Sequence, residues 1–305
     1  MRKVLVKARS HKLCWWLLAL ALFAYGCGKN QPETAETPPV RPTSYEQLIA
    51  LSDDDLAQVD VARMNLLCAE GLAGAEDLDV QAALWKLDRW ARLAKASEEK
   101  YLPQFWANQA RYDHSLAKFK AVNLALTIKE DLGCGYNLEL VRSGVMSDVR
   151  STRFFQNSKD LFLHGFLSEQ QAGSCASLPV LMVALGRRLD YPVYLVACKG
   201  HLFCRWDDGK ERFNIETAMQ GVDSKPDSYY YRWPHPTNEA EAQAEGYLTN
   251  LTPRQELAVF AQLRAACLQE NRDYAGAADA YEIALATFPD SSLIKQYLNR
   301  AKSKI

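Results

Sequence analysis

Residues 173–216 decide the fold, and they read GSCASLPVLMVALGRRLDYPVYLVACKGHLFCRWDDGKERFNIE. In the first part, from Ala176 to Leu189, apolar residues recur at the spacing of a buried helix. Pro179 falls in the first turn of that helix, where proline is tolerated because the early backbone amides have no partner within the helix. Ser174 is a suitable N-cap. We therefore expect a helix that begins directly after Cys175.

The hydrophobic repeat changes after Asp190, from about 3.6 residues to about 2. The new repeat predicts three strands, which cover residues 191–198, 201–206 and 210–216. The link Asp207-Asp208-Gly209 is typical of a hairpin, because glycine supplies the positive φ that tight turns require. A helix followed by strands joined through such turns predicts an antiparallel sheet and an α+β fold.

Helical segments flank this core on both sides. Residues 44–110 have apolar positions at helical spacing between acid-rich turns, so we expect a helical N-terminal region before a core that spans 111–250. Residues 251–305 are also predicted to be helical, and 258–291 resemble a tetratricopeptide repeat, with an unrelated helical hairpin as the alternative. The residues that carry this resemblance are Asp273, Tyr274, Ala277, Tyr281, Ala284 and Pro289. A single repeat must dock on the core to bury its faces, and residues 291–302 would form its capping helix.

The N-terminal segment, residues 1–26, has the composition of a signal peptide. Five cations and no acidic residue accompany an apolar run that is too short for a bilayer, which needs about 20 apolar residues. The run ends at Gly26-Cys27, which resembles a bacterial lipoprotein cleavage site, so Cys27 is the predicted lipidation residue. A chance cysteine in a membrane anchor, or behind a conventionally cleaved signal, is the alternative. Residues 27–43 are rich in proline and polar residues and predict an extended tether.

The overall composition excludes two classes of protein. With 48% hydrophobic and 24% charged residues in a chain of 305, disorder throughout is excluded. The formal net charge of -1 gives no excess of positive charge, so nucleic acid is not an expected partner. The six cysteines beyond Cys27 are widely spaced, which is not the pattern of a disulfide scaffold, and their pairing is left open.

Three residues of the central segment are candidates for chemistry, namely Cys175, His201 and Glu216. Cys175 lies at the N-terminus of the predicted helix, where free amides and the helix dipole favour a thiolate. His201 begins the second strand, and Glu216 ends the third strand on the same face as Asn214, because side chains alternate along a strand. A base and an orienting acceptor would thus face the thiol.

The order of these parts resembles the transglutaminase-like branch of the papain-type cysteine superfamily. Gly-x-Cys opens the helix, Gly-His opens a strand and an acidic residue ends the next strand, and the resemblance covers about residues 110–222. It implies a triad in which Cys175 attacks a carbonyl, His201 takes the proton and a third residue holds the imidazole. The family usually has aspartate at the third position. Glu216 is the expected counterpart here, with Asn214 as the alternative.

Catalysis by such a triad would also need hydrogen-bond donors for the oxyanion, and Gln170 and Gln171 are candidates together with the backbone amide of the cysteine. A metal site is not expected. Cys198 and Cys204 are each three residues from His201, but on one continuous strand they would face away from it, and no fourth ligand is near. We expect no cofactor.

Two functional hypotheses follow from these features. The first is cysteine-dependent acyl transfer or amide hydrolysis on a peptide or protein substrate, carried out by a lipid-anchored protein outside the cytoplasm of a bacterium. The second is a non-catalytic binding or scaffold lipoprotein that presents its surface to an envelope protein. Cys175, His201 and a third residue in hydrogen-bond sequence favour the enzyme, whereas a buried thiol with His201 turned away favours the scaffold.

Overall fold

The computed structural model describes residues 40–142, 152–217 and 224–305, and residues 39–305 form one compact unit. The predicted signal peptide, Cys27 and most of the predicted tether lie outside the described residues. Within the described ranges, no helix is both long and apolar enough to cross a membrane.

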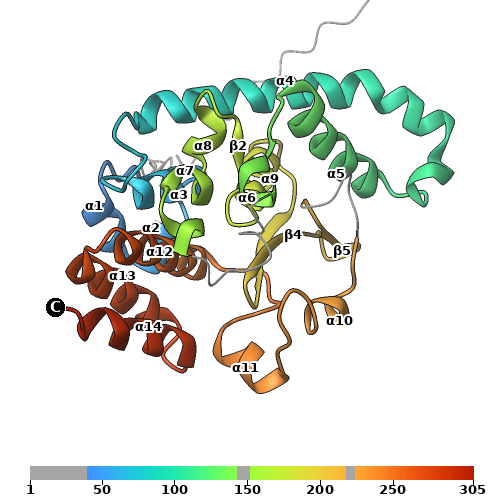
Figure 1. The fold of residues 1–305 in the computed structure, drawn as a ribbon. Helices are drawn as coiled ribbons and strands as arrows, with labels where there is room; N and C mark the ends of the chain where they lie inside the picture. The colour runs from blue at the N-terminus through green and yellow to red at the C-terminus, as the bar shows by residue number, and fades with distance from the viewer. Residues whose placement is uncertain (1–39, 143–151, 218–223) are drawn as a thin grey trace, which may run out of the picture. The chain divides into compact units, whose positions relative to one another are not determined.

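The centre of the fold is a helix packed on a three-stranded antiparallel sheet, which confirms the α+β class (Figure 1). Helix α9 spans Leu178–Arg188 and contacts both β3 (Val193–Cys198) and β4 (His201–Asp207). Strand β5 (Arg212–Ile215) completes the order β3-β4-β5. The strands lie where the period of 2 predicts them, and Gly209 has the positive φ, 79°, that the hairpin turn requires.

Helix α9 begins later than its sequence predicts. The expected start was Ala176 with Ser174 as N-cap, but residues 174–177 form a separate turn, and the helix begins at Leu178. Two serines hold this turn. The Ser177 hydroxyl accepts from the Ser174 amide at 3.0 Å, and both hydroxyls donate to the carbonyl of Asp160, at 2.6 and 3.1 Å. Cys175 therefore lies on a tight turn just before the helix.

Helices of the N-terminal region cover the side of α9 that faces away from the sheet. Their bounds are α1 (Tyr45–Ile49), α2 (Asp53–Leu56), α3 (Val61–Ala69), α4 (Val80–Ala107) and α5 (Leu116–Leu126). Helix α9 contacts α3, α4 and α5 as well as the sheet, so every residue from Leu178 to Gly186 is buried. The helix that carries the cysteine turn is thus fixed from both sides.

The C-terminal region contains the helices that the sequence predicts. Helices α12 (Pro253–Glu270), α13 (Tyr274–Thr287) and α14 (Ser292–Lys302) pack in succession, and α12 also packs on α3. An ion pair ties α12 to the C-terminal end of α9, because Arg187 Nη1 donates to Glu256 Oε2 at 3.0 Å. Glu256 is buried, as are its neighbours Leu257 and Phe260.

A second, very short sheet was not anticipated from the sequence. Strand β1 (Gly135–Tyr136) pairs in parallel with β2 (Ala172–Gly173), and the amide of Asn137 donates to the carbonyl of Gly173 at 2.8 Å. The pairing places Tyr136 beside Gly173, two residues before Cys175. The remaining elements are η1 (Gln109–Tyr112), η2 (Thr127–Asp131), α6 (Leu138–Arg142), η4 (Thr152–Phe155), α7 (Ser158–Leu161), α8 (His164–Leu167), α10 (Asp227–Tyr230) and α11 (Glu239–Ala244).

Candidate active site

Cys175, His201 and Glu216 come together from three separate elements. His201 Nε2 lies 2.9 Å from Glu216 Oε2, and both side chains are buried. The thiol of Cys175 lies close enough to His201 to affect the pKa of the imidazole. Because Nε2 faces the carboxylate, Nδ1 is the ring nitrogen left for the thiol. The three side chains therefore lie together in the order thiol, imidazole and carboxylate.

Local geometry explains the position of each member. Gly200, with φ 80°, makes the tight turn between β3 and β4, so that His201 is the first residue of β4 and pairs with Cys198. Glu216 follows β5 directly, which carries its side chain to the same end of the sheet. Gly173 has no room for a side chain, because a Cβ there would collide with the Ser177 hydroxyl and the ring of Phe166. The turn that bears the cysteine thus depends on this glycine.

Glu216, and not Asn214, is the residue that contacts the imidazole. Arg205 lies opposite Asn214 in the β4-β5 register and donates from Nε to the Asn214 side-chain oxygen at 2.7 Å. The amide nitrogen of Asn214 donates to the carbonyl of Lys225 at 2.8 Å and to Asp227 Oδ1 at 2.7 Å. Both ends of the Asn214 amide are therefore engaged away from the imidazole.

The charge state of His201 follows from its neighbours. Burial alone would lower the pKa of the imidazole, because it disfavours the charged form. The hydrogen bonds with Cys175 and Glu216, and the negative charges that those groups can carry, outweigh burial and raise the pKa of His201 to about 9. The site therefore favours an imidazolium at neutral pH, between an acidic group and a thiol.

Aromatic residues that follow β5 cover this cluster. The Tyr230 hydroxyl donates to Glu216 Oε2 at 3.1 Å, and its ring stacks on Phe203 with 3.9 Å between centroids. The edge of Trp233 contacts the His201 ring, with 4.7 Å between centroids. In the sequence these aromatics suit either a cover over a substrate cleft or a loop packed on the core. The cluster of tyrosines and tryptophan from Tyr229 onwards was the available signal, but it does not say which ring reaches the carboxylate.

Tyr136 was also missed from the sequence, and it connects the cluster to a surface hollow of about 470 Å³. The residues that line this hollow are Gly133, Gly135, Tyr136, Asn137, Leu138, Glu139, Gln170, Gln171 and Ala172. The Tyr136 hydroxyl oxygen is buried and has no hydrogen-bond partner in the described part of the chain. Burial, followed by the negative charges that Cys175 and Glu216 can carry, raises the pKa of Tyr136 well above its ordinary value.

The two glutamines proposed as oxyanion donors lie in the wall of this hollow. Both are exposed, and the Gln170 side-chain nitrogen donates to Asp160 Oδ1 at 3.2 Å. Across residues 40–142, 152–217 and 224–305, no hydrogen bond joins the side chain of Gln170 or Gln171 to Cys175 or His201. The two glutamines therefore lie in the wall of the hollow and form no hydrogen bond with the thiol or the imidazole.

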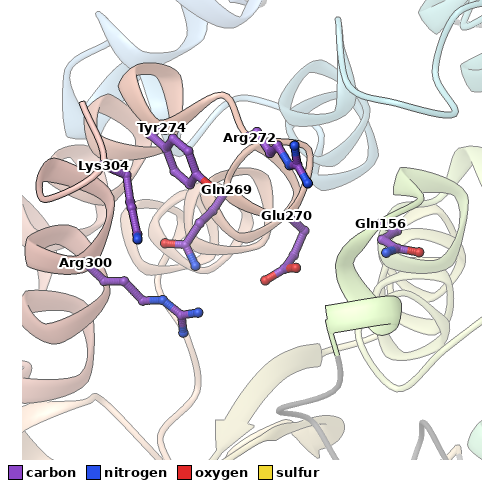
Figure 2. A pocket seen from close by; sticks show the side chains of 7 residues that line it. All are labelled: Gln156, Gln269, Glu270, Arg272, Tyr274, Arg300 and Lys304. Carbon is purple, nitrogen blue, oxygen red and sulfur yellow. The ribbon is translucent and has the colours of Figure 1, made fainter.

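A second hollow, of about 290 Å³, contains none of the candidate residues (Figure 2). It lies among the ends of α12 and α14 and the start of α13, and it is lined by Gln156, Gln269, Glu270, Arg272, Tyr274, Arg300 and Lys304. No nucleophilic cysteine or histidine faces it. The hollow at Tyr136 is the nearer of the two to the cysteine turn, because its lining residues Tyr136 and Ala172 belong to the β1-β2 ladder that ends at Gly173.

Of the other cysteines, Cys198 lies beside this cluster, because it pairs with His201 in the β3-β4 register. All six cysteines of the described ranges are free and buried, and no group of three potential metal ligands occurs there. Cys204 donates from its sulfur to the carbonyl of Pro179 at 3.2 Å, on the side of β4 that faces α9, whereas His201 faces Glu216. The spacing of Cys198, His201 and Cys204 thus reflects strand packing.

Comparison with known proteins gives no relative: the chain matches no family model, no curated protein and no solved structure.

Proposed function

We propose that the protein catalyses cysteine-dependent acyl transfer or amide hydrolysis on a peptide or protein substrate. In this proposal Cys175 is the nucleophile, His201 is the base, and Glu216 orients the imidazole. The observation that carries it is the series of Cys175, His201 and Glu216, with the thiol beside the imidazole and the carboxylate 2.9 Å from it. The same series is the arrangement that separates an enzyme from a scaffold with an inert thiol.

Each step assigns the electrons and protons to named groups. His201 carries, as an imidazolium, the proton that the Cys175 thiol loses, and the sulfur attacks the amide carbonyl carbon, so that a carbon-sulfur bond forms. The carbon-nitrogen bond then breaks, and the departing amine leaves with the proton from His201. The resulting thioester is cleaved by water, which gives hydrolysis, or by a second amine, which gives transfer. Glu216 stays ionised and stabilises the imidazolium throughout.

The resemblance to the transglutaminase-like branch supports the same mechanism. The cysteine turn before a buried helix, the histidine at the start of the adjacent strand and the acid after the next strand occur here in that order in space as well as in sequence. The expected aspartate is replaced by the longer Glu216. The hydroxyl of Tyr230 donates to the same carboxylate oxygen at 3.1 Å and helps to hold the longer side chain in place.

Electrophile labelling of the full chain at neutral pH tests the assignment. We expect iodoacetamide to alkylate Cys175 selectively, since burial raises the pKa of Cys134 and of Cys267 to about 11 and so keeps those thiols protonated. The variant His201→Ala should slow this alkylation roughly 100-fold or more, in line with the loss of a general base. Peptide mapping by mass spectrometry identifies the labelled residue, and Cys175→Ser is the matched control.

Slow labelling of Cys175 that does not depend on His201 would remove the enzyme assignment. The scaffold hypothesis would then hold, because an inert thiol in a folded protein is what it requires. Circular dichroism of each variant establishes that the compared proteins are folded.

For the location we propose a lipid-anchored protein outside the cytoplasm of a bacterium. The proposal rests on the cations and the short apolar run of residues 1–26, and on Gly26-Cys27. We expect mass spectrometry of the mature protein to find an N-terminus at Cys27 that carries diacylglycerol and an amide-linked acyl chain. An intact Met1 contradicts both export and anchoring, whereas a cleaved chain with unmodified Cys27 contradicts only the anchor.

A further inference from the structure

The Tyr136 hydroxyl is a buried donor that has no acceptor in the described part of the chain. Tyr136 lines the hollow and also pairs with Gly173, which leads into the cysteine turn. The parallel pairing of β1 with β2 sets Tyr136 beside Gly173, two residues before Cys175. Its oxygen is shielded from solvent and has no partner in the described part of the chain. An unpaired buried hydroxyl costs roughly 1–3 kcal/mol, so a position that retains one calls for a reason other than stability.

We propose that the Tyr136 hydroxyl donates a hydrogen bond to the carbonyl oxygen of the bound substrate, and that the hollow in front of it holds the acyl part of that substrate. This inference rests on the proposed function and adds the residue that stabilises the oxyanion. When the Cys175 sulfur bonds to the carbonyl carbon, the carbonyl π electrons move to the oxygen. The Tyr136 proton stays on tyrosine and bonds to that oxygen until the carbon-oxygen double bond forms again.

Three properties of Tyr136 suit this role. The hydroxyl is shielded from water, where a hydrogen bond to a developing charge is strongest. Burial beside two acidic groups keeps the phenol protonated, so that it retains a proton to donate. A substrate oxygen would supply the hydrogen-bond acceptor that the described part of the chain does not provide for this hydroxyl. The backbone amide of Cys175, which makes no hydrogen bond among the described residues, is a second donor on the adjoining turn.

The other side chains around the hollow suit an oxyanion donor less well than Tyr136 does. Gln170 is engaged by Asp160, and both glutamines lie in the exposed wall of the hollow. The lining has one acidic side chain, Glu139, and no lysine or arginine. A neutral, amide-rich acyl group such as a peptide segment suits a wall of glycine, asparagine and glutamine, whereas a strongly anionic group would find no cation there.

Two electrophiles that react with the same Cys175 sulfur distinguish stabilisation of the oxyanion by Tyr136 from the nucleophilic reaction itself. Iodoacetamide alkylates the thiolate by displacement and forms no oxyanion, whereas p-nitrophenyl acetate acylates it through a tetrahedral oxyanion and releases p-nitrophenolate. In the full chain, Tyr136→Phe should slow acylation roughly 10-fold to 1,000-fold, the range for loss of one oxyanion donor, and should leave alkylation within about twofold. Tyr101→Phe, at an exposed tyrosine of α4 outside the hollow, is the matched control and should change neither rate.

The outcomes are distinct. Selective loss of acylation in Tyr136→Phe supports the inference, whereas equal slowing of both reactions, or of neither, overturns it while the nucleophile assignment stands. Alkylation of the wild type that is slow and independent of His201 overturns the proposed function and this inference together. The Phe variant removes no hydrogen bond, so it should unfold at the wild-type temperature or above; a fall of several degrees would assign Tyr136 to stability instead.

Discussion

Two buried polar clusters lie on the same face of β4, and they differ in how completely their hydrogen bonds are made. Arg205 follows His201 by four residues on that strand, so both side chains leave the same face. Arg205 donates from all three side-chain nitrogens, with partners at 2.6 to 3.2 Å. These partners are Asn214, Leu248, Asn250 and Asp227.

The cluster around His201 is less complete. Tyr136 and Thr217, at its edges, each have a buried hydroxyl without a partner in the described ranges. A fully bonded network resists change, because each partner that leaves exposes another buried group. A network with open donors can accept a further molecule at no such cost. We therefore predict that Arg205 stabilises the fold and that His201 takes part in the proposed reaction.

The largest effect that we expect from this comparison is on stability, at Arg205. Arg205→Met keeps the length of the side chain but leaves Asn214 and the carbonyl of Leu248 without their donor, so we expect the free energy of unfolding to fall by about 3 kcal/mol. Urea unfolding measures this change. Arg212→Met, on the neighbouring strand, removes a half-exposed arginine and should cost less than about 1 kcal/mol.

Alkylation of Cys175 in the folded Arg205→Met protein should remain within about twofold of the wild-type rate, since Arg205 acts on stability and not on the thiol. A loss of stability no greater than that of Arg212→Met, or a strong loss of alkylation, would erase the distinction between the two clusters.

A smaller effect should appear in the pH dependence of stability. The pKa of His201 is raised from 6.5 to about 9, so its stabilising contribution is fully present below about pH 6.5 and is lost as pH rises through about 9. The full difference corresponds to roughly 3 kcal/mol. Glu216→Gln removes one of the two acidic partners, so the loss between about pH 6 and about pH 10 should be about 1–2 kcal/mol smaller in the variant.

Urea unfolding of both proteins at the two pH values measures this difference, and His164 offers an internal comparison. Burial lowers the pKa of His164 to about 4, so stability gains about 1 kcal/mol from this residue above pH 6 as the unfolded imidazole loses its proton, and this gain is the same in both proteins. An equal loss of stability in the wild type and in Glu216→Gln would show that the carboxylate does not hold the imidazolium.

The central fold was predictable because its pattern is local. A change of period at Asp190 and a glycine at the hairpin turn are enough to define three antiparallel strands. The start of α9 was less predictable, since two serines and a glycine turn the chain once more before the helix begins. That turn depends on the carbonyl of Asp160, fourteen or more residues away in sequence.

The site was predictable in part for the same reason. Cys175, His201 and Glu216 each stand at the end of a predictable element, but alternation alone places Asn214 and Glu216 on one face and cannot choose between them. Arg205 makes that choice, and a buried arginine within an apolar strand is the sequence signal that a polar partner lies opposite. Tyr136 gave no such signal, because a two-residue parallel ladder has no period to detect.

The buried contact of Arg187 with Glu256 sets a limit on how this chain can be divided. In sequence, helices α12 to α14 resemble a separate part of the chain. In the structure, Glu256 of α12 pairs with Arg187 at the C-terminal end of α9. Helix α12 also packs on α3, and its residues Leu257 and Phe260 are buried. Removal of residues 251–305 would expose this apolar surface of α3 to water. A shortened chain that keeps the cysteine turn must therefore cover α3 in another way.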